Sequence, residues 1–195
     1  MLIACVKTGK KYGANYVKRL QAGVYRNLSG NHKRHCFVCY TDDPVEGVTC
    51  HHLPAALPGW WAKLGLFMTG EPMLYFDLDV VITGDLTRAL EWPDFGILKD
   101  PWLPGYNSSI MRLTGSERHV WEQFHPSVMN MMRGDQDWIN IAMPGAATFP
   151  NDWFPSFKAD QITDEPPPGA MAVNLHGFPK PHQMTSGWVP RVWCE

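Results

Sequence analysis

Two aspartates one residue apart, Asp77 and Asp79, follow the apolar segment Met73–Phe76. Carboxylates at this spacing can bind one divalent cation, directly or through water. Such a cation would neutralise the charge of a diphosphate leaving group. Apolar residues precede and follow the pair, and a carboxylate among apolar residues is costly unless a cation compensates its charge. This favours a metal site. A solvated strand end with helix-capping aspartates is the simpler alternative.

Polar residues later in the chain form two further candidate groups. Asp135 and Gln136 stand together, and their carboxylate and amide can bind the hydroxyls of a sugar. The alternative is the first turn of a helix, where the helix dipole favours acidic residues. Asn107, which precedes a predicted strand, can likewise bind a polyol or cap a turn.

Basic residues supply the remaining candidates. His176 closes a predicted strand, and its neutral imidazole can bind a metal. Lys180 follows it and can meet a phosphate as a point charge. The alternative for both is a proline-rich tail with an incidental histidine. Lys63, on a predicted short helix, is either a phosphate partner or a surface lysine, and its local sequence favours the surface.

Three cysteines form a candidate zinc site: Cys36 and Cys39 are separated by two residues, and Cys50 lies downstream. Residues three apart on a strand point to opposite faces of the sheet, so Cys36 and Cys39 cannot easily share one ion. The pattern therefore favours structural, partly buried cysteines over a zinc-binding interaction protein.

Alternating strand and helix patterns must position these residues. In the first half, strands are predicted at Leu2–Val6, His35–Thr41 and Met73–Phe76, with a further possible strand at Val48–Leu53. Helices are predicted over 13–28 and Trp60–Met68. The second half predicts strands at Phe95–Leu98, Ser109–Leu113 and Ala172–His176, a helix over Ser116–Met132 that breaks at Pro126, and loop over 144–171. This order is typical of an α/β fold with a mostly parallel central sheet between two helical layers. Ligands bind beyond the carboxyl ends of such strands, where Asp77 and Asp79 fall.

Composition narrows the classes of protein. The 195 residues are 45% hydrophobic and 18% charged, which suits one domain with a buried core and excludes a disordered chain or a coiled coil. The net charge of −2 argues against nucleic-acid binding through bulk charge. Five cysteines without regular spacing fit a reducing compartment. No apolar run reaches the ~20 residues of a membrane span, so the sequence predicts a soluble, cytoplasmic protein.

In this order, the motifs resemble glycosyltransferases of the GT-A fold, most closely glycosyltransferase family 8, the group of glycogenin and the lipopolysaccharide galactosyltransferases. The matching segments are Ala62–Leu64, Leu74–Val81, Tyr106–Met111, Asp135–Asn140 and His176–Pro181. The resemblance implies a single GT-A-like, Rossmann-like domain over 1–195. Its nucleotide-binding half would span about 1–100, and its sugar and acceptor half about 101–195.

The resemblance also implies the roles of the site residues. Asp77, Asp79 and His176 would hold Mn²⁺ or Mg²⁺ on the diphosphate of a nucleotide sugar. The donor would be held by Thr8, Tyr12, Lys63, Leu78, Gly177 and Lys180. The catalytic set facing the donor sugar and the acceptor would be Asn107, Asp135 and Gln136. The implied reaction moves a sugar, with UDP as the expected nucleotide and with retention, to a glycan, lipid-linked, protein or small-molecule acceptor.

The sequence departs from the family in two places and leaves two alternatives open. The segment between His176 and Lys180 is shorter than in the family, and Ser109 stands where glycine is common. Phe76–Thr83 also resembles the first motif of haloacid-dehalogenase-like phosphatases, with Asp77 as nucleophile and Asp79 as acid/base. That motif normally lies on the first strand, whereas here apparent α/β structure precedes it. A non-catalytic nucleotide- or sugar-binding module of the same fold is the other alternative.

Overall fold

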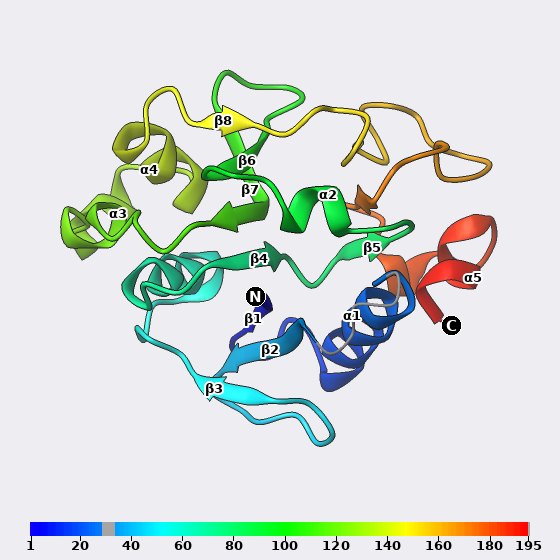
Figure 1. The fold of residues 1–195 in the computed structure, drawn as a ribbon, viewed down its shortest axis with the longest axis horizontal. Helices are drawn as coiled ribbons and strands as arrows, with labels where there is room; N and C mark the ends of the chain where they lie inside the picture. Colours follow the sequence, from blue (N-terminus) through cyan, green and yellow to red (C-terminus); the bar gives the residue numbers. More distant parts are fainter. Residues whose placement is uncertain (29–33, 195) are drawn as a thin grey trace.

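A seven-stranded sheet forms the centre of the computed structural model, which describes residues 1–28 and 34–194. Its strands follow the order β3-β2-β1-β4-β7-β6-β8 (Figure 1). Their bounds are β1 Leu2–Lys7, β2 Cys36–Thr41, β3 Cys50–His52, β4 Met73–Phe76, β6 Gly96–Lys99, β7 Tyr106–Leu113 and β8 Ala147–Thr148. Within this sheet β7 alone runs against the others, since it pairs antiparallel with both β4 and β6. The predicted α/β class with a mostly parallel sheet is confirmed.

Helices cover both faces of the sheet. The helix α1 (Ala14–Arg26) and the C-terminal α5 (Trp188–Cys194) lie on one side, and α3 (His119–Glu122) and α4 (Asp135–Ala142) on the other (Figure 1). The 3₁₀ helix η1 (Gly59–Met68) packs with α3 and α4. The short helices that remain are α2 (Thr87–Leu90), η2 (Pro126–Asn130) and η3 (Pro181–Gln183). Within 1–28 and 34–194, no helix has the length and apolar character that a membrane crossing requires.

The strands β1 and β4 separate two apolar clusters because successive side chains point to opposite faces. Ile3 and Phe76 pack in the cluster beneath α1, whereas Ala4 and Tyr75 pack in the cluster beneath η1. All four are essentially inaccessible to solvent. This double burial explains why both strands read as continuous apolar runs in the sequence.

Two short strands form a second sheet that the sequence patterns do not predict as a pair. β5 (Val80–Ile82) pairs antiparallel with β9 (Ala172–Asn174), with Val81 opposite Val173. β5 begins directly after Asp79, and β9 ends just before His176. This pairing brings the two predicted site segments together.

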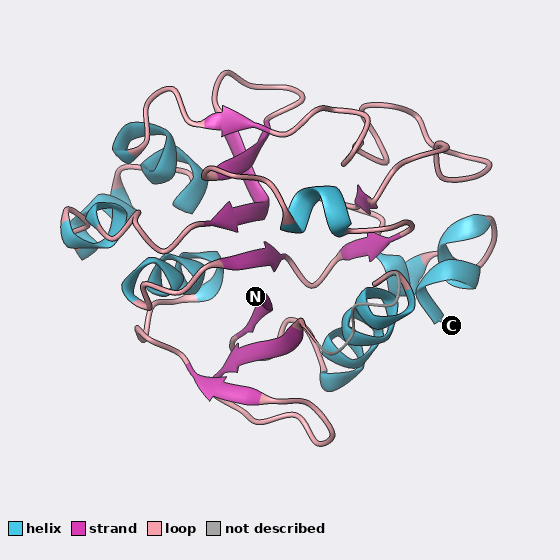
Figure 2. Ribbon diagram, viewed as in Figure 1, coloured by secondary structure: helices cyan, strands magenta, loops and turns pink. Residues whose placement is uncertain are grey.

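Several segments differ from the sequence prediction. The strand expected at Ser109–Leu113 begins already at Tyr106, so Asn107 lies within β7 rather than before it. The expected helix over Trp60–Met68 is a 3₁₀ helix, and the late strand ends at Asn174 rather than His176. The expected helix over 116–132 is divided as predicted at Pro126, but it is shorter than expected, with α3 beginning only at His119 and η2 ending at Asn130. Pro126 begins η2, because proline lacks the amide hydrogen that a continuous helix needs. The segment 144–171 is mostly loop, as expected, apart from β8 (Figure 2).

We expect Gly115→Ala to destabilise the fold by about 2 kcal/mol or more, because two effects combine there. Gly115 has φ +94°, and a Cβ atom would lie 2.4 Å from the carbonyl oxygen of Gly70. Gly9→Ala is the matched control, since Gly9 has φ +61° but open space around it. Denaturant unfolding of both variants measures the difference. Equal losses would mean that the contact with Gly70 contributes nothing.

Candidate active site

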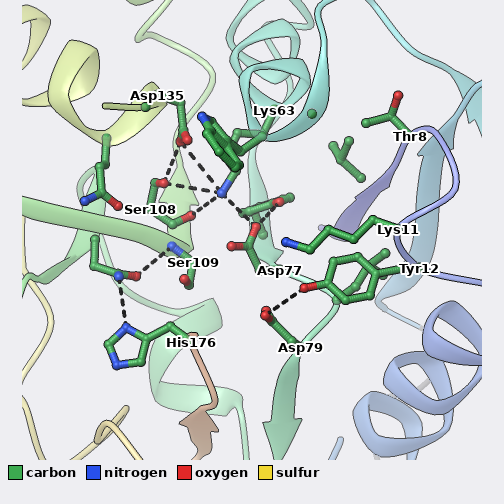
Figure 3. A pocket seen from close by; sticks show the side chains of 18 of the residues that line it. Thr8, Lys11, Tyr12, Lys63, Asp77, Asp79, Ser108, Ser109, Asp135 and His176 are labelled. Carbon is green, nitrogen blue, oxygen red and sulfur yellow. Dashed lines mark hydrogen bonds and ion pairs between the residues drawn. The ribbon is translucent and has the colours of Figure 1, made fainter. Parts of the chain in front are cut away.

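A pocket of about 410 Å³ lies at the carboxyl ends of β1 and β4, next to the start of β7. Every residue to which the family resemblance assigns a metal-binding, donor-binding or catalytic role lines it. Figure 3 shows the pocket with Asp77, Asp79 and His176 among the labelled residues. The residues with these assigned roles are Thr8, Tyr12, Lys63, Asp77, Leu78, Asp79, Asn107, Asp135, Gln136, His176, Gly177 and Lys180. Their common location supports one site; their individual roles stay predictions.

The turn after β4 places the two aspartates. The backbone N–H of Asp77 donates to the carbonyl of Ser109 at 2.7 Å, the last link between β4 and β7. The chain then turns, and the N–H of Val80 donates to the carbonyl of Asp77 at 3.2 Å. Leu78 is 3% exposed and anchors this turn in the core. Asp77 and Asp79 therefore both face the pocket.

Lys63 lies at the centre of a buried charge cluster. Its Nζ donates to Asp77 Oδ1 at 2.7 Å and lies 3.7 Å from Asp135 Oδ2 (Figure 3). It also contacts the carbonyl and hydroxyl oxygens of Ser108, each at 3.3 Å. Lys63 is 4% exposed, so the local expectation of a surface lysine is wrong. The carboxylates compensate its charge, which is what allows a lysine to be buried.

Burial and ion pairing oppose each other in this cluster. Burial lowers the pKa of Lys63, but the carboxylates of Asp135 and Asp77 outweigh it and raise that pKa overall. Burial raises the pKa of Asp135, although Lys63 and Ser108 act in the other direction. Tyr75 donates its hydroxyl to Asp77 Oδ1, and burial with that carboxylate raises the pKa of the phenol. Lys63 therefore stays cationic, and Tyr75 stays neutral.

Asp79 belongs to a second cluster on the other side of the pocket. Its Oδ2 accepts a hydrogen bond from the Tyr12 hydroxyl at 2.9 Å and forms an ion pair with Lys180. Asp79 is 6% exposed and Lys180 is 8% exposed. Burial and Asp79 raise the pKa of Tyr12, so its hydroxyl remains a donor. Each aspartate of the pair thus has its own lysine and its own tyrosine.

His176 is held by neighbours on both ring nitrogens. Its Nδ1 lies 3.5 Å from Asn107 Nδ2, and its Nε2 lies 2.8 Å from the Ser156 hydroxyl. Asn107 Oδ1 in turn accepts from Asn174 Nδ2 at 3.3 Å and from the Ser109 N–H at 3.0 Å. Burial lowers the pKa of His176, which favours the neutral ring that this arrangement needs.

These contacts bear on the predicted metal site. Asp77 and Asp79 each use one carboxylate oxygen for their lysine and tyrosine. The other oxygen of each has no hydrogen bond to the described part of the chain, and hard oxygen ligands suit Mn²⁺ or Mg²⁺. His176 has no free nitrogen in this arrangement. Accordingly, no three His, Cys, Asp or Glu side chains within 1–28 and 34–194 are arranged to hold a metal ion. The two carboxylates fit a cation, and the imidazole would have to exchange partners first.

Several pocket residues are not among those predicted from the sequence. They are Val6, Lys11, Gly59, Trp60, Tyr75, Ser108, Ser109, Arg133 and Gly134. Ser108 and Ser109 lie within the motif around Asn107, and Arg133 and Gly134 immediately precede Asp135, so the sequence contained a signal for these four. Tyr75 carries none, because its position within an apolar strand indicates a core residue.

Among the residues that the structure describes, the cysteines form no group that could hold a metal ion. Cys36 is exposed and Cys39 is buried, as expected for residues three apart on a strand. Cys39 instead lies between Cys5 and Cys50 of the neighbouring strands in the register of the sheet.

Comparison with known proteins gives similarity of fold at low sequence identity. No family model matches the chain, and no curated protein matches its sequence. Among solved structures, the glycosyltransferase GlyE of Streptococcus pneumoniae superposes with a TM-score of 0.75 at 15% identity over 98% of this chain. The chain spans 60% of the length of GlyE.

Two other structures give a similar result. The galactosyltransferase LgtC, crystallised with donor and acceptor sugar analogues, has a TM-score of 0.71 at 15% identity. That match covers 98% of this chain and 94% of LgtC. The bifunctional glycosyltransferase WbbM has a TM-score of 0.67 at 13% identity, over 99% of this chain and 51% of WbbM. The chain therefore has the GT-A-like glycosyltransferase fold that its motifs predict.

Proposed function

We propose that the chain is a glycosyltransferase that transfers a sugar from a nucleotide-sugar donor to an acceptor hydroxyl. The observation that carries this proposal is the convergence of Asp77, Asp79, Lys63 and Lys180 in one pocket with Asp135 and Gln136. Paired carboxylates and buried lysines suit a diphosphate and its cation, and the adjoining carboxylate and amide suit sugar hydroxyls. The fold shared with GlyE and LgtC supports the same class of reaction.

Asp77 and Asp79 would hold the divalent cation through their unpaired oxygens. When bound, that cation would offset the negative charge of the departing diphosphate. Lys180 and the exposed Lys11 would contact the phosphates as point charges. Asn107, Asp135 and Gln136 would orient the donor sugar, so catalysis would rest mainly on positioning and electrostatics. UDP is the nucleotide we propose.

Retention of the anomeric configuration is part of the proposal. The three acidic side chains that line the pocket each contact a lysine: Asp77 and Asp135 contact Lys63, and Asp79 contacts Lys180. In this proposal the free oxygens of Asp77 and Asp79 bind the cation, and Asp135 is buried against Lys63 and Ser108, so none of the three serves as a nucleophile. Most glycoside hydrolases instead use a pair of carboxylates. The acceptor oxygen would bond to the anomeric carbon as the carbon–oxygen bond to the diphosphate breaks, and the departing phosphate oxygen would take the acceptor proton.

The deciding experiment is a thermal-shift panel of UDP, GDP, CDP and dTDP, each with Mn²⁺ or with EDTA. A ligand at 100 times its Kd stabilises the folded state by about 2.7 kcal/mol, which is roughly 5–11 °C in Tm for a chain of this size. We expect UDP to give such a shift with Mn²⁺ and little or none with EDTA. A shift with another nucleotide would correct the base, and an equal shift in EDTA would contradict the metal site.

Two further outcomes separate the alternatives. Nucleotide binding without any transfer or donor hydrolysis would identify a non-catalytic binding module. If no nucleotide shifts Tm and the protein hydrolyses phosphate esters with Mg²⁺, the phosphatase hypothesis is correct. The fold shared with GlyE and LgtC favours sugar transfer over this outcome.

A further inference from the structure

An exposed aromatic ring lies at the edge of the pocket. Trp102, in the loop between β6 and β7, is 58% exposed. Its ring stacks on the imidazole of His176, with the centroids 4.4 Å apart and the planes 16° from parallel. His176 lines the pocket, whereas Trp102 does not. The indole therefore extends the pocket wall outward from His176 to the surface.

The loop that carries this ring is held in place. Asp100 Oδ1 accepts the backbone N–H groups of Trp102 and Leu103, both at 2.9 Å. The N–H of Asp100 donates to the carbonyl of Gly105 at 3.0 Å, which closes the loop. Gly105 has φ +111° and lies against Asn140 of α4. These contacts fix the position of the exposed indole beside the pocket.

Polar groups lie next to the ring. Gln136 Nε2 is 3.4 Å from Asp100 Oδ2, the oxygen that does not bind the loop. Gln136 lines the pocket, so it links the loop of Trp102 to the proposed donor site. A pyranose ring has one face of C–H groups, which packs on an aromatic ring, and hydroxyls at its edge, which bind carboxylates and amides. Trp102, Asp100 and Gln136 provide this combination.

We propose that Trp102 is the platform for the acceptor and that the acceptor unit bound there is a hexopyranose. This inference rests on the proposed function, which places the diphosphate of the donor at Asp77 and Asp79 and leaves the outer site for the acceptor. Asp100 is a positioning residue in this scheme, because it fixes the loop that presents the indole.

Titration with simple sugars followed by NMR tests the proposal. The indole N–H resonance of Trp102 is identified with Trp102→Phe, and methyl glycosides of glucose, galactose, mannose and N-acetylglucosamine are added with and without UDP and Mn²⁺. We expect at least one glycoside to shift this resonance. Trp102→Ala should weaken its binding about tenfold and Trp102→Phe by less, because a smaller aromatic surface remains.

Controls separate this inference from the proposed function. Ile141→Ala removes another exposed apolar side chain, 57% exposed and outside the pocket lining, and should leave glycoside binding unchanged. The nucleotide thermal shift should be the same in Trp102→Ala as in the wild type. The proposal is overturned if no glycoside shifts the resonance, if Trp102→Ala binds the glycoside as tightly, or if only an alkyl chain such as hexanol shifts it. If the wild type binds no nucleotide, the proposed function is overturned instead. The glycoside titration without nucleotide would then still show whether Trp102 binds a sugar.

Discussion

Asp79→Asn is expected to lower transfer by at least about 100-fold, the effect of losing one preorganised electrostatic group. The substitution removes a carboxylate proposed to hold the cation, while the amide keeps the volume of the side chain. It also leaves the buried Lys180 without its ion-pair partner. Sugar transfer measured as nucleotide release, together with Tm, records both consequences. Full Mn²⁺-dependent activity in this variant would contradict the metal role of Asp79.

A double variant separates the two consequences. Asp79→Asn combined with Lys180→Met removes both charges of the pair, and a pair replaced by uncharged groups costs far less than one broken from one side. We expect the double variant to regain most of the stability lost by Asp79→Asn and none of the transfer activity. Recovery of activity along with stability would mean that Asp79 serves only to neutralise Lys180.

Lys63→Met is expected to destabilise the protein by about 3–5 kcal/mol, or roughly 6–20 °C in Tm. The change leaves Asp135, which is 4% exposed, buried without the cation 3.7 Å away. Lys11→Met is the matched control, because Lys11 also lines the pocket but is exposed and should change stability by less than about 0.5 kcal/mol. Similar losses in both variants would contradict the structural role of Lys63.

The loss should also depend on pH in a defined direction. The folded state already raises the pKa of Asp135, and removal of Lys63 should raise it further. A carboxyl whose folded pKa is raised is favoured when protonated, so its contribution is intact below the ordinary pKa of aspartate and is lost as pH rises towards the folded value. The stability deficit of Lys63→Met should therefore be smaller at pH 4 than at pH 7. A deficit independent of pH would show that Asp135 is not the group left uncompensated.

Much of the fold was predictable because its first half follows local rules. The apolar runs that become β1 and β4 are buried on both faces, and the helical spacing of Val17, Leu20 and Val24 marks the face of α1 that packs on the sheet. The aspartate pair directly after a buried strand located the pocket. These signals lie within a few residues of one another, so a single sequence contains them.

The features that could not be predicted from the sequence depend on contacts between segments far apart in the chain. Lys63 is buried because Asp77 and Asp135 meet there, and nothing in its own helix indicates this. The pairing of β5 with β9 joins two strands of three residues each, too short to be identified by pattern. Trp102 lies in a loop rich in proline and glycine, where the sequence shows an aromatic residue but not the histidine beneath it.

The antiparallel strand β7 limits the changes in length that the chain can accommodate. Its successive residues serve opposite sides of the sheet: Ser108 contacts Lys63 and Asp135, whereas Asn107 contacts His176 and Asn174. Deleting or inserting one residue at the start of β7 would exchange these partners and disrupt both sides at once. Individual substitutions there affect one side only. Among related sequences, the length of this segment should therefore be constant.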